Sequence, residues 1–325
     1  RMIKANGRPM KSNFDLDALL DGIRSNDRAA LGRAITLVES NTPEDRDRTQ
    51  ELLTALLPFT GGSRRIGISG VPGVGKSTFI ESFGLTLVED GHRVAVLAVD
   101  PSSSVSKGSI LGDKTRMEKL ARSDGAFIRP SPTGGSLGGV ARKTREAILV
   151  CEAAGYNVVL VETVGVGQSE ATVAEMVDFF LLLKLAGAGD ELQGIKRGIL
   201  ELADLIAINK ADGDNLQAAD LARAEFERAL AILRPEDEDG WTPRVVTSSG
   251  QTGAGLDEIW QLIEEHHLLV SGNGVLEKRR QHQLLGWMWS LVDEGLRSAI
   301  RERSEMALTL ADLEKKVLHG NTTPT

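Results

Sequence analysis

Residues 70–77 read Gly70-Val71-Pro72-Gly73-Val74-Gly75-Lys76-Ser77, which fits the pattern G-x-x-x-x-G-K-[ST]. The glycines allow backbone angles that side chains forbid, so successive N–H groups can point inward at anionic oxygens. Residues 65–69 are typical of a buried strand, and residues 78–89 are typical of an amphipathic helix whose positive end faces the loop. Strand, loop and helix together predict a nucleoside triphosphate site; the alternative is a glycine-rich turn without a ligand.

The parts of this loop have separate expected roles. Lys76 would reach the β- and γ-phosphates as a catalytic cation, and the Ser77 hydroxyl would hold Mg²⁺. The expected nucleotide contacts are Gly70, Val71, Pro72, Gly73, Val74, Gly75, Lys76, Ser77 and Thr78.

A second motif indicates which nucleotide binds. An apolar run at 203–208 leads directly into Asn209-Lys210-Ala211-Asp212. The Asp212 carboxylate can accept hydrogen bonds from both N1–H and the 2-amino group of guanine. Adenine offers neither donor, so its binding would leave a buried carboxylate unpaired. Asn209 can hold the loop beside the base and the Lys210 stem can pack along the ring, which together predict GTP rather than ATP.

A further guanine contact is expected after the last predicted strand. There Thr247-Ser248-Ser249-Gly250 resembles the loop that contacts guanine through its backbone. Ser248, Ser249 and Gly250 are therefore candidate nucleotide-binding residues.

Acidic residues at strand ends are candidates for the metal. Asp100 ends the predicted strand 93–99 and could hold a Mg²⁺ water. Asp113 lies in a stretch rich in Ser, Gly and charge, and could reach the metal when that stretch closes over the γ-phosphate. The alternative for Asp113 is to cap the helix that follows.

Glu162-Thr163-Val164-Gly165 follows the predicted strand 157–162, where most GTPases have D-x-x-G. The Glu162 carboxylate suits a metal-bound or attacking water, and the Gly165 N–H could sense the γ-phosphate. Gln168 stands three residues past the glycine rather than one, so we expect slow hydrolysis that a partner could accelerate by ordering these loops.

The segment 187–196 mixes glycine with charge and amide groups directly after a strand. We favour a third nucleotide-responsive loop with Lys196 as a catalytic candidate; a solvated connection is the alternative. Lys184, inside the preceding apolar strand, must find a partner or lie near the strand's exposed end.

The order of patterns predicts three parts. Residues 1–62 contain no strand-like run and predict a helical module, and residues 271–325 predict a long helix followed by a shorter one. Residues 63–270 alternate strand and helix, which predicts an α/β GTPase domain with a mainly parallel sheet covered on both faces. The expected strands are 65–69, 93–99, 125–129, 157–162, 178–185, 205–209 and 244–247, and the helices between them include 113–121, 141–154, 213–233 and 256–269.

The long C-terminal helix carries an apolar stripe that needs a surface to cover it. The stripe consists of Leu284, Leu285, Met288, Leu291, Val292, Leu296 and Ile300. Packing on the chain's own domain is one explanation. We favour a homodimer joined through this arm, because Trp287 and Trp289 lie beside the stripe and tryptophan is enriched at interfaces.

Composition narrows the class of protein. The chain has 325 residues, a formal net charge of −8 and one cysteine, which excludes an internal disulfide and fits a reducing compartment. The acidic balance argues against nucleic acid as a partner. No apolar run approaches membrane-spanning length, and the start lacks a signal peptide's apolar core. We therefore expect a cytoplasmic protein without a nucleic acid or membrane partner.

Several stretches between residues 65 and 215 match one known family. They are 70–78, 98–104, 107–117, 129–132, 134–139, 162–169, 189–197 and 209–212. On these motifs the chain resembles the MeaB/ArgK (MMAA-type) family of P-loop GTPases. The resemblance implies a SIMIBI-type P-loop NTPase fold and a chaperone that uses GTP to gate cofactor loading of an adenosylcobalamin-dependent methylmalonyl-CoA mutase and to protect that enzyme.

The resemblance also implies a homodimer joined through the C-terminal arms and three switch loops, at 100–117, 162–170 and 187–196. We expect no cobalamin on this chain itself. The cobalamin motif D-x-H-x-x-G begins at Asp90-Gly91-His92, but Ala95 stands where the last glycine belongs.

Two other functions remain as alternatives. A metallochaperone GTPase would need a Cys/His cluster, whereas this chain has one cysteine and five scattered histidines. A protein kinase acting on a transport binding protein would need a base for the substrate hydroxyl near the γ-phosphate.

Overall fold

The computed structural model describes residues 15–40, 42–99, 117–130, 137–163, 169–187, 197–233, 240–302 and 304–323. Within these ranges the chain forms a seven-stranded sheet in the order β3-β2-β4-β1-β5-β6-β7, and all neighbouring strands are parallel. The strands are β1 (Arg64–Gly70), β2 (Val94–Val99), β3 (Ala126–Arg129), β4 (Val158–Thr163), β5 (Phe179–Leu185), β6 (Leu205–Asn209) and β7 (Arg244–Thr247). The predicted α/β fold is confirmed, and each strand lies within one residue of its expected bounds.

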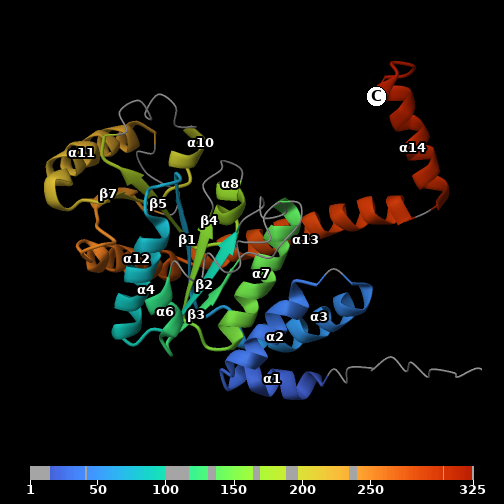
Figure 1. Cartoon of the computed structure of the whole chain (residues 1–325), viewed down its shortest axis with the longest axis horizontal. Helices are drawn as coiled ribbons and strands as arrows, with labels where there is room; N and C mark the ends of the chain where they lie inside the picture. Colours follow the sequence, from blue (N-terminus) through green and yellow to red (C-terminus); the bar gives the residue numbers. More distant parts are fainter. Residues whose placement is uncertain are drawn as a thin grey trace, which may run out of the picture. The chain divides into compact units, whose positions relative to one another are not determined.

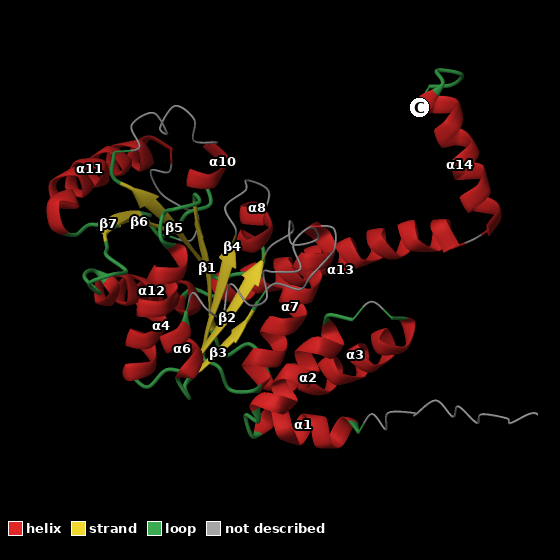
Figure 2. Cartoon of the chain, viewed as in Figure 1, coloured by secondary structure: helices red, strands yellow, loops and turns green. Residues whose placement is uncertain are grey.

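Helices cover both faces of this sheet, as Figure 2 shows. They are α4 (Lys76–Glu89), α6 (Glu118–Arg122), α7 (Leu137–Ala153), α8 (Ser169–Ala174), α10 (Arg197–Leu200), α11 (Leu216–Leu233) and α12 (Leu256–Gly272), with a 3₁₀ turn η2 (Gly213–Asn215) before α11. Successive residues of β4 reach opposite faces. Leu160 packs in an apolar cluster with Phe79 of α4, whereas Val159 packs in another cluster with Ile148 of α7. Strands that are apolar on both faces are what a covered parallel sheet requires.

The helices predicted between the strands are present with shifted ends. α7 begins at Leu137, before the expected residue 141, and α12 continues to Gly272, beyond the expected residue 269. α6 begins at Glu118 with Met117 at its N-cap position, and Asp113 lies outside the described residues. The remainder of the predicted helix 113–121 lies outside the described residues.

The N-terminal part is helical, as predicted. It consists of α1 (Leu16–Arg24), α2 (Arg28–Val38), α3 (Pro43–Leu56) and a 3₁₀ turn η1 (Leu57–Phe59). These helices lie beside α7 (Figure 1) and share an apolar cluster with it, in which Leu31, Leu52 and Cys151 are fully buried. They therefore pack on one face of the sheet through α7.

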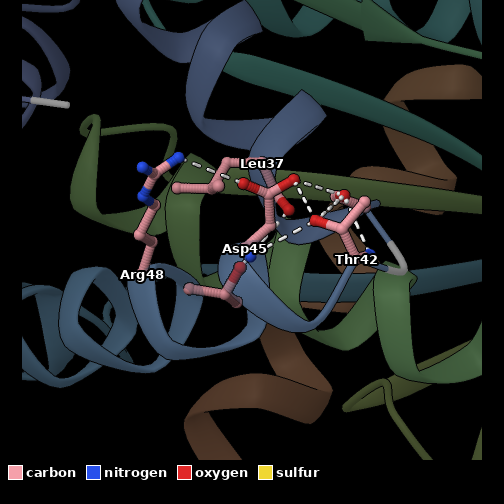
Figure 3. A network of polar contacts seen from close by, with 6 residues as sticks. Leu37, Thr42, Asp45 and Arg48 are labelled. Atoms are coloured by element: carbon pink, nitrogen blue, oxygen red, sulfur yellow. Dashed lines mark hydrogen bonds and ion pairs between the residues drawn. The ribbon is translucent and has the colours of Figure 1, made fainter. Parts of the chain in front are cut away.

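Side chains fix the start of α3, as Figure 3 shows. Thr42 is the N-cap, and its Oγ1 accepts a hydrogen bond from the Asp45 N–H at 3.3 Å. The Thr42 and Ser40 hydroxyls donate to Asp45 Oδ2 at 2.7 and 2.6 Å, and Arg48 lies 3.4 Å from Oδ1. The hydrogen bonds from Ser40 and Thr42 lower the pKa of Asp45 below its ordinary value. This network pins the turn between α2 and α3.

A buried carboxylate ties the segment after η1 to α7. Glu152 of α7 accepts hydrogen bonds from the Gly61 N–H at 2.8 Å and from the Ser63 hydroxyl at 2.5 Å. The Arg65 guanidinium donates to both Glu152 oxygens, at 2.8 and 2.9 Å. The carboxylate thereby fixes the chain at the point where it enters β1.

The chain divides into two compact units, residues 1–269 and 270–325. The second unit contains α13 (Val275–Glu302) and α14 (Ser304–Leu318), which agrees with the predicted long helix and shorter helix. The division into functional parts at residues 62 and 270 remains a prediction. None of the helices in the described ranges combines the length and hydropathy that crossing a bilayer requires.

Candidate nucleotide site

The predicted phosphate loop lies between β1 and α4. β1 ends at Gly70, α4 begins at Lys76, and Gly73 and Gly75 have φ angles of 85° and 91°, in the left-handed region that favours glycine. A Cβ on Gly70 would lie 2.7 Å from the carbonyl oxygen of Leu183 in the neighbouring strand β5. Glycine is therefore required along this loop for conformation and for space, which fits a backbone cradle for phosphates.

Lys76 lies at the first turn of α4 and folds back over the loop. Its Nζ donates to the carbonyl oxygens of Gly70 at 2.6 Å and Val71 at 3.3 Å. Burial lowers the pKa of Lys76, and the negative charges of Glu162 and Glu170 oppose that shift. Those two carboxylates thus act electrostatically on the same ammonium group that would meet the phosphates.

Asn209, at the end of β6, links directly to the phosphate loop and to the loop after β7. Its Nδ2 donates to the Val74 carbonyl oxygen at 2.8 Å, within the phosphate loop. Its Oδ1 accepts from the Gly250 N–H at 3.2 Å and from the Ser248 hydroxyl at 3.4 Å. The buried Asn209 side chain therefore holds the end of β6, the phosphate loop and the loop after β7 together.

Lys210 makes a second link to the phosphate loop. Its Nζ donates to the Gly73 carbonyl oxygen at 2.8 Å, and its φ of 60° places a non-glycine residue in the left-handed region. The stem of an exposed lysine held in this way can lie along a bound base, as predicted.

Asp212 is held by the loop that follows β7. The Ser249 hydroxyl donates to Asp212 Oδ2 at 2.5 Å, and the Thr252 N–H donates to the Ser249 oxygen at 3.1 Å. Asp212 is half-buried, whereas Ser248, Ser249 and Gly250 are buried. The predicted base-reading carboxylate therefore has a fixed orientation before any base arrives.

Glu162 lies near the carboxyl end of β4, between Ile68 of β1 and Ala98 of β2 in the sheet register. The next residue, Thr163, donates its hydroxyl to the Ser69 hydroxyl at 2.8 Å, and both side chains are buried. This pair connects the strand that precedes the phosphate loop to the strand that carries Glu162.

Other predicted site residues lie outside the described ranges. They are Asp100, Asp113, Gly165, Gln168 and Lys196. Ser77 and Thr78 lie in the first turn of α4; Ser77 is half-buried and Thr78 is exposed. Lys184 lies within β5 and is buried, with its Nζ 5.9 Å from the centre of the Phe226 ring, so the strand continues through this cation.

Sequence patterns did not single out several residues of the site. Glu170 acts on Lys76, Ser69 bonds to Thr163, and Ser82 of α4 donates to the Gly250 carbonyl oxygen at 2.5 Å. Hydroxyl and carboxyl side chains on helices and strands are common, and only the folded structure shows what these three contact.

A phosphate loop between β1 and α4, joined to an N-K-x-D loop at the carboxyl ends of parallel strands, defines the class of P-loop GTPases. Within that class the chain belongs to the MeaB family, because the family model described as "Methylmalonyl Co-A mutase-associated GTPase MeaB" matches residues 31–305. The predicted family resemblance is confirmed.

Known proteins agree with this assignment. A putative GTPase of Caulobacter vibrioides is 56% identical over 94% of this chain and 94% of its own length. A mitochondrial methylmalonic aciduria type A homolog of Mus musculus is 47% identical over 95% of this chain and 77% of its own length. The crystal structure of a LAO/AO transport system kinase has 40% identity and a TM-score of 0.76, covering 95% of this chain and 93% of that one. The chain is a GTP-binding protein and GTPase of this family.

Proposed function

We propose that this chain is a GTP-hydrolysing chaperone for an adenosylcobalamin-dependent methylmalonyl-CoA mutase, which gates cofactor loading and protects the mutase. The observation that carries the GTP part is the Asn209 side chain, which joins the phosphate loop to the guanine-reading loop. The mutase part is supported by the family description over residues 31–305 and by the mouse relative's name.

The proposed chemistry is positioning and charge stabilisation, which is most of what phosphoryl transfer needs. Lys76, which now donates to loop carbonyls, would turn to the β- and γ-phosphates. Ser77 and Glu162, with Asp100 and Asp113, would hold Mg²⁺, whose role is to neutralise phosphate charge. Oxygen donors of this kind suit that ion.

Hydrolysis itself would depend on loops that the partner orders. We propose that Glu162 orients the attacking water, that Asp113 and Lys196 act when their loops close, and that the Gly165 N–H senses the γ-phosphate. Because Gln168 stands away from the position next to that glycine, turnover should be slow alone and faster with the mutase.

The proposed quaternary partner is a second copy of the chain. Within the second unit α13 exposes apolar side chains along one side, including Leu284, Met288 and Trp289, which are 54%, 46% and 61% exposed. Contiguous exposed apolar side chains on one side of a helix mark a surface that packs against a partner. The absence of cobalamin, nucleic acid and membrane as ligands, and the cytoplasmic location, stay predictions.

The mutase proposal is tested with purified components. The chain and an adenosylcobalamin-dependent methylmalonyl-CoA mutase are mixed with GTP and Mg²⁺, run on a sizing column, and assayed for phosphate release. We expect co-elution and faster GTP turnover. Lys76→Ala should remove turnover, which shows that the phosphate released comes from this site. The absence of both co-elution and stimulation, with every such mutase tested, would rule the proposal out.

A second candidate is protein phosphorylation, because the similar crystal structure is named a transport system kinase. Labelled GTP and purified transport binding proteins would test it. Stable label on a binding protein, absent with Lys76→Ala, would favour this candidate. For the metallochaperone alternative, the described residues contain no group of three or more His, Cys, Asp and Glu placed to hold a metal ion.

A further inference from the structure

The loop after β7, whose Ser249 holds Asp212, packs directly against α4. Ser82, on the second turn of α4, donates its hydroxyl to the Gly250 carbonyl oxygen at 2.5 Å. Gly250 lies so close to this helix that a Cβ on it would be 2.8 Å from both the N and the Cα of Phe79. Backbone and hydroxyl contacts together set how far this loop stands from α4.

Gly250 is bonded on both sides of its backbone. Its N–H donates to Asn209 Oδ1 at 3.2 Å, and its carbonyl accepts from Ser82. The residue before it, Ser249, donates to Asp212 Oδ2. A continuous set of contacts therefore leads from Ser82 through Gly250 and Ser249 to the carboxylate proposed to read guanine.

We propose that Ser82 is a positioning residue for guanine selectivity, an inference that rests on the proposed guanine site. Ser82 would not touch the nucleotide. Without its hydroxyl, the Gly250 carbonyl loses its partner on α4, the loop can shift, and Ser249 no longer holds Asp212 in place. The loss of affinity should therefore fall on guanine, whose N1–H and 2-amino group need both Asp212 oxygens at once.

Inosine triphosphate separates that contact from the rest. Hypoxanthine keeps the N1–H of guanine but lacks the 2-amino group, so it needs only one oxygen of Asp212. A carboxylate that is no longer held should therefore lose more affinity for GTP than for ITP. General loosening of the protein would weaken binding of both nucleotides equally.

The experiment measures the dissociation constants of GTP and ITP with Mg²⁺ by titration calorimetry on the full chain. For Ser82→Ala we expect GTP to bind about fivefold to tenfold more weakly and ITP to change by less than about twofold, the scale of one lost hydrogen bond. Ser82→Thr keeps the hydroxyl and should keep the wild-type ratio. Thr86→Ala is the matched control, because the Thr86 hydroxyl donates to the Ser82 carbonyl oxygen on the same helix.

A second variant reaches the same loop without changing Ser82. Gly250→Ala would place a Cβ against the backbone of α4 and push the loop away, so it should show the same selective loss of GTP over ITP. An unchanged GTP-to-ITP ratio in Ser82→Ala, with a wild type that prefers GTP, would overturn the role of Ser82 whatever Gly250→Ala does, and would leave the GTPase proposal standing. A wild type that does not prefer guanine would overturn both.

Discussion

At the scale of single residues, Asn209 shows how one side chain can organise a site. An amide has both donors and an acceptor, so Asn209 can donate to Val74 and accept from Gly250 and Ser248 at once. Aspartate could not donate to the phosphate loop, and alanine would leave three buried groups without their partner. This explains in physical terms why the first position of the motif is an asparagine.

The base-reading role of Asp212 predicts a change of nucleotide. Asp212→Asn replaces an acceptor by a group that can donate, so binding of GTP should weaken by more than about tenfold while xanthosine triphosphate binds better. Dissociation constants of both nucleotides measure the switch. Asp214→Asn, an exposed acid two residues further on, removes the same charge and should change neither value. An Asp212→Asn variant that still prefers GTP to xanthosine triphosphate would contradict the base-reading role of Asp212.

The lowered pKa of Lys76 predicts a pH dependence of binding. The phosphates need the protonated amine, and the free protein loses that proton at a lower pH than an ordinary lysine does. The dissociation constant of GTP should therefore rise as the pH rises through this lowered pKa. In Lys76→Arg the cation stays charged, so any remaining pH dependence reports the other ionisable groups of the site and of the nucleotide. Identical pH profiles for wild type and variant would count against Lys76 as the phosphate-binding cation.

Sequence patterns predicted these residues unevenly, for a physical reason. Lys76, Asn209 and Asp212 stand in short motifs whose chemistry requires fixed residue types at fixed spacing. Ser82 and Glu170 act on the site from helices, where nothing in the local sequence distinguishes them from surface residues. Their contacts depend on how distant segments pack, and the folded structure supplies that information.

At the scale of elements, the strands were the most predictable part of the chain. Runs such as Val158–Val161 are apolar on both faces, as a covered parallel sheet requires, and they are bounded by polar residues. Helix ends were less predictable, because α7 starts within a glycine-rich stretch and α6 starts at Glu118, where the N-cap residue Met117 provides no side-chain hydrogen bond. Lys184 continues β5 despite its charge; it pairs with Ile208 of β6 in the sheet register, and its Nζ lies 5.9 Å from the centre of the Phe226 ring.

The N-cap of α3 predicts a stability effect separate from the site. Thr42→Ala should lower the free energy of unfolding by about 1 kcal/mol, because the Asp45 N–H and carboxylate lose a partner. Urea unfolding measures this value. Thr54→Ala on the same helix is the control and should cost little, since its exposed hydroxyl bonds only to the Gln50 carbonyl oxygen within the helix.

The pH dependence of this cap follows from Asp45. Its pKa is lower in the folded chain than in the unfolded chain, so the network stabilises the fold above the ordinary carboxyl pKa. That contribution is lost as the pH falls through the lowered pKa. The difference between Thr42→Ala and wild type should therefore narrow in acid; a constant difference would show that the Asp45 charge plays no part.

At the scale of the whole molecule, helices pack on both faces of the sheet in the first unit, and this packing positions the loops at the carboxyl ends of the strands. The N-terminal helices, α7 and the strands share an apolar cluster in which Leu31 and Cys151 are fully buried. Burial raises the pKa of the Cys151 thiol, so this cysteine is unreactive while the cluster is intact. The second unit instead leaves apolar side chains of α13 exposed.

The proposed homodimer predicts the outcome of one surface change. Met288→Glu places a charge within the exposed apolar side of α13, twice in a symmetric dimer, and should weaken dimerisation at least about tenfold. Ser290→Glu adds the same charge about 200° around the helix and should leave the dimer intact. Analytical ultracentrifugation of both variants measures the effect. A wild-type chain that sediments as a monomer at all concentrations would contradict the dimer.

The most direct measurement is a calorimetric titration of the full chain with GTP and with ATP in the presence of Mg²⁺. Because adenine would leave the Asp212 carboxylate without its donors, GTP should bind at least about a hundredfold more tightly than ATP. Lys76→Ala should weaken the binding of both nucleotides, because it removes a contact to the phosphates that they share. Equal affinity of the wild-type chain for GTP and ATP would contradict the guanine site, and with it the chaperone function proposed for this GTPase.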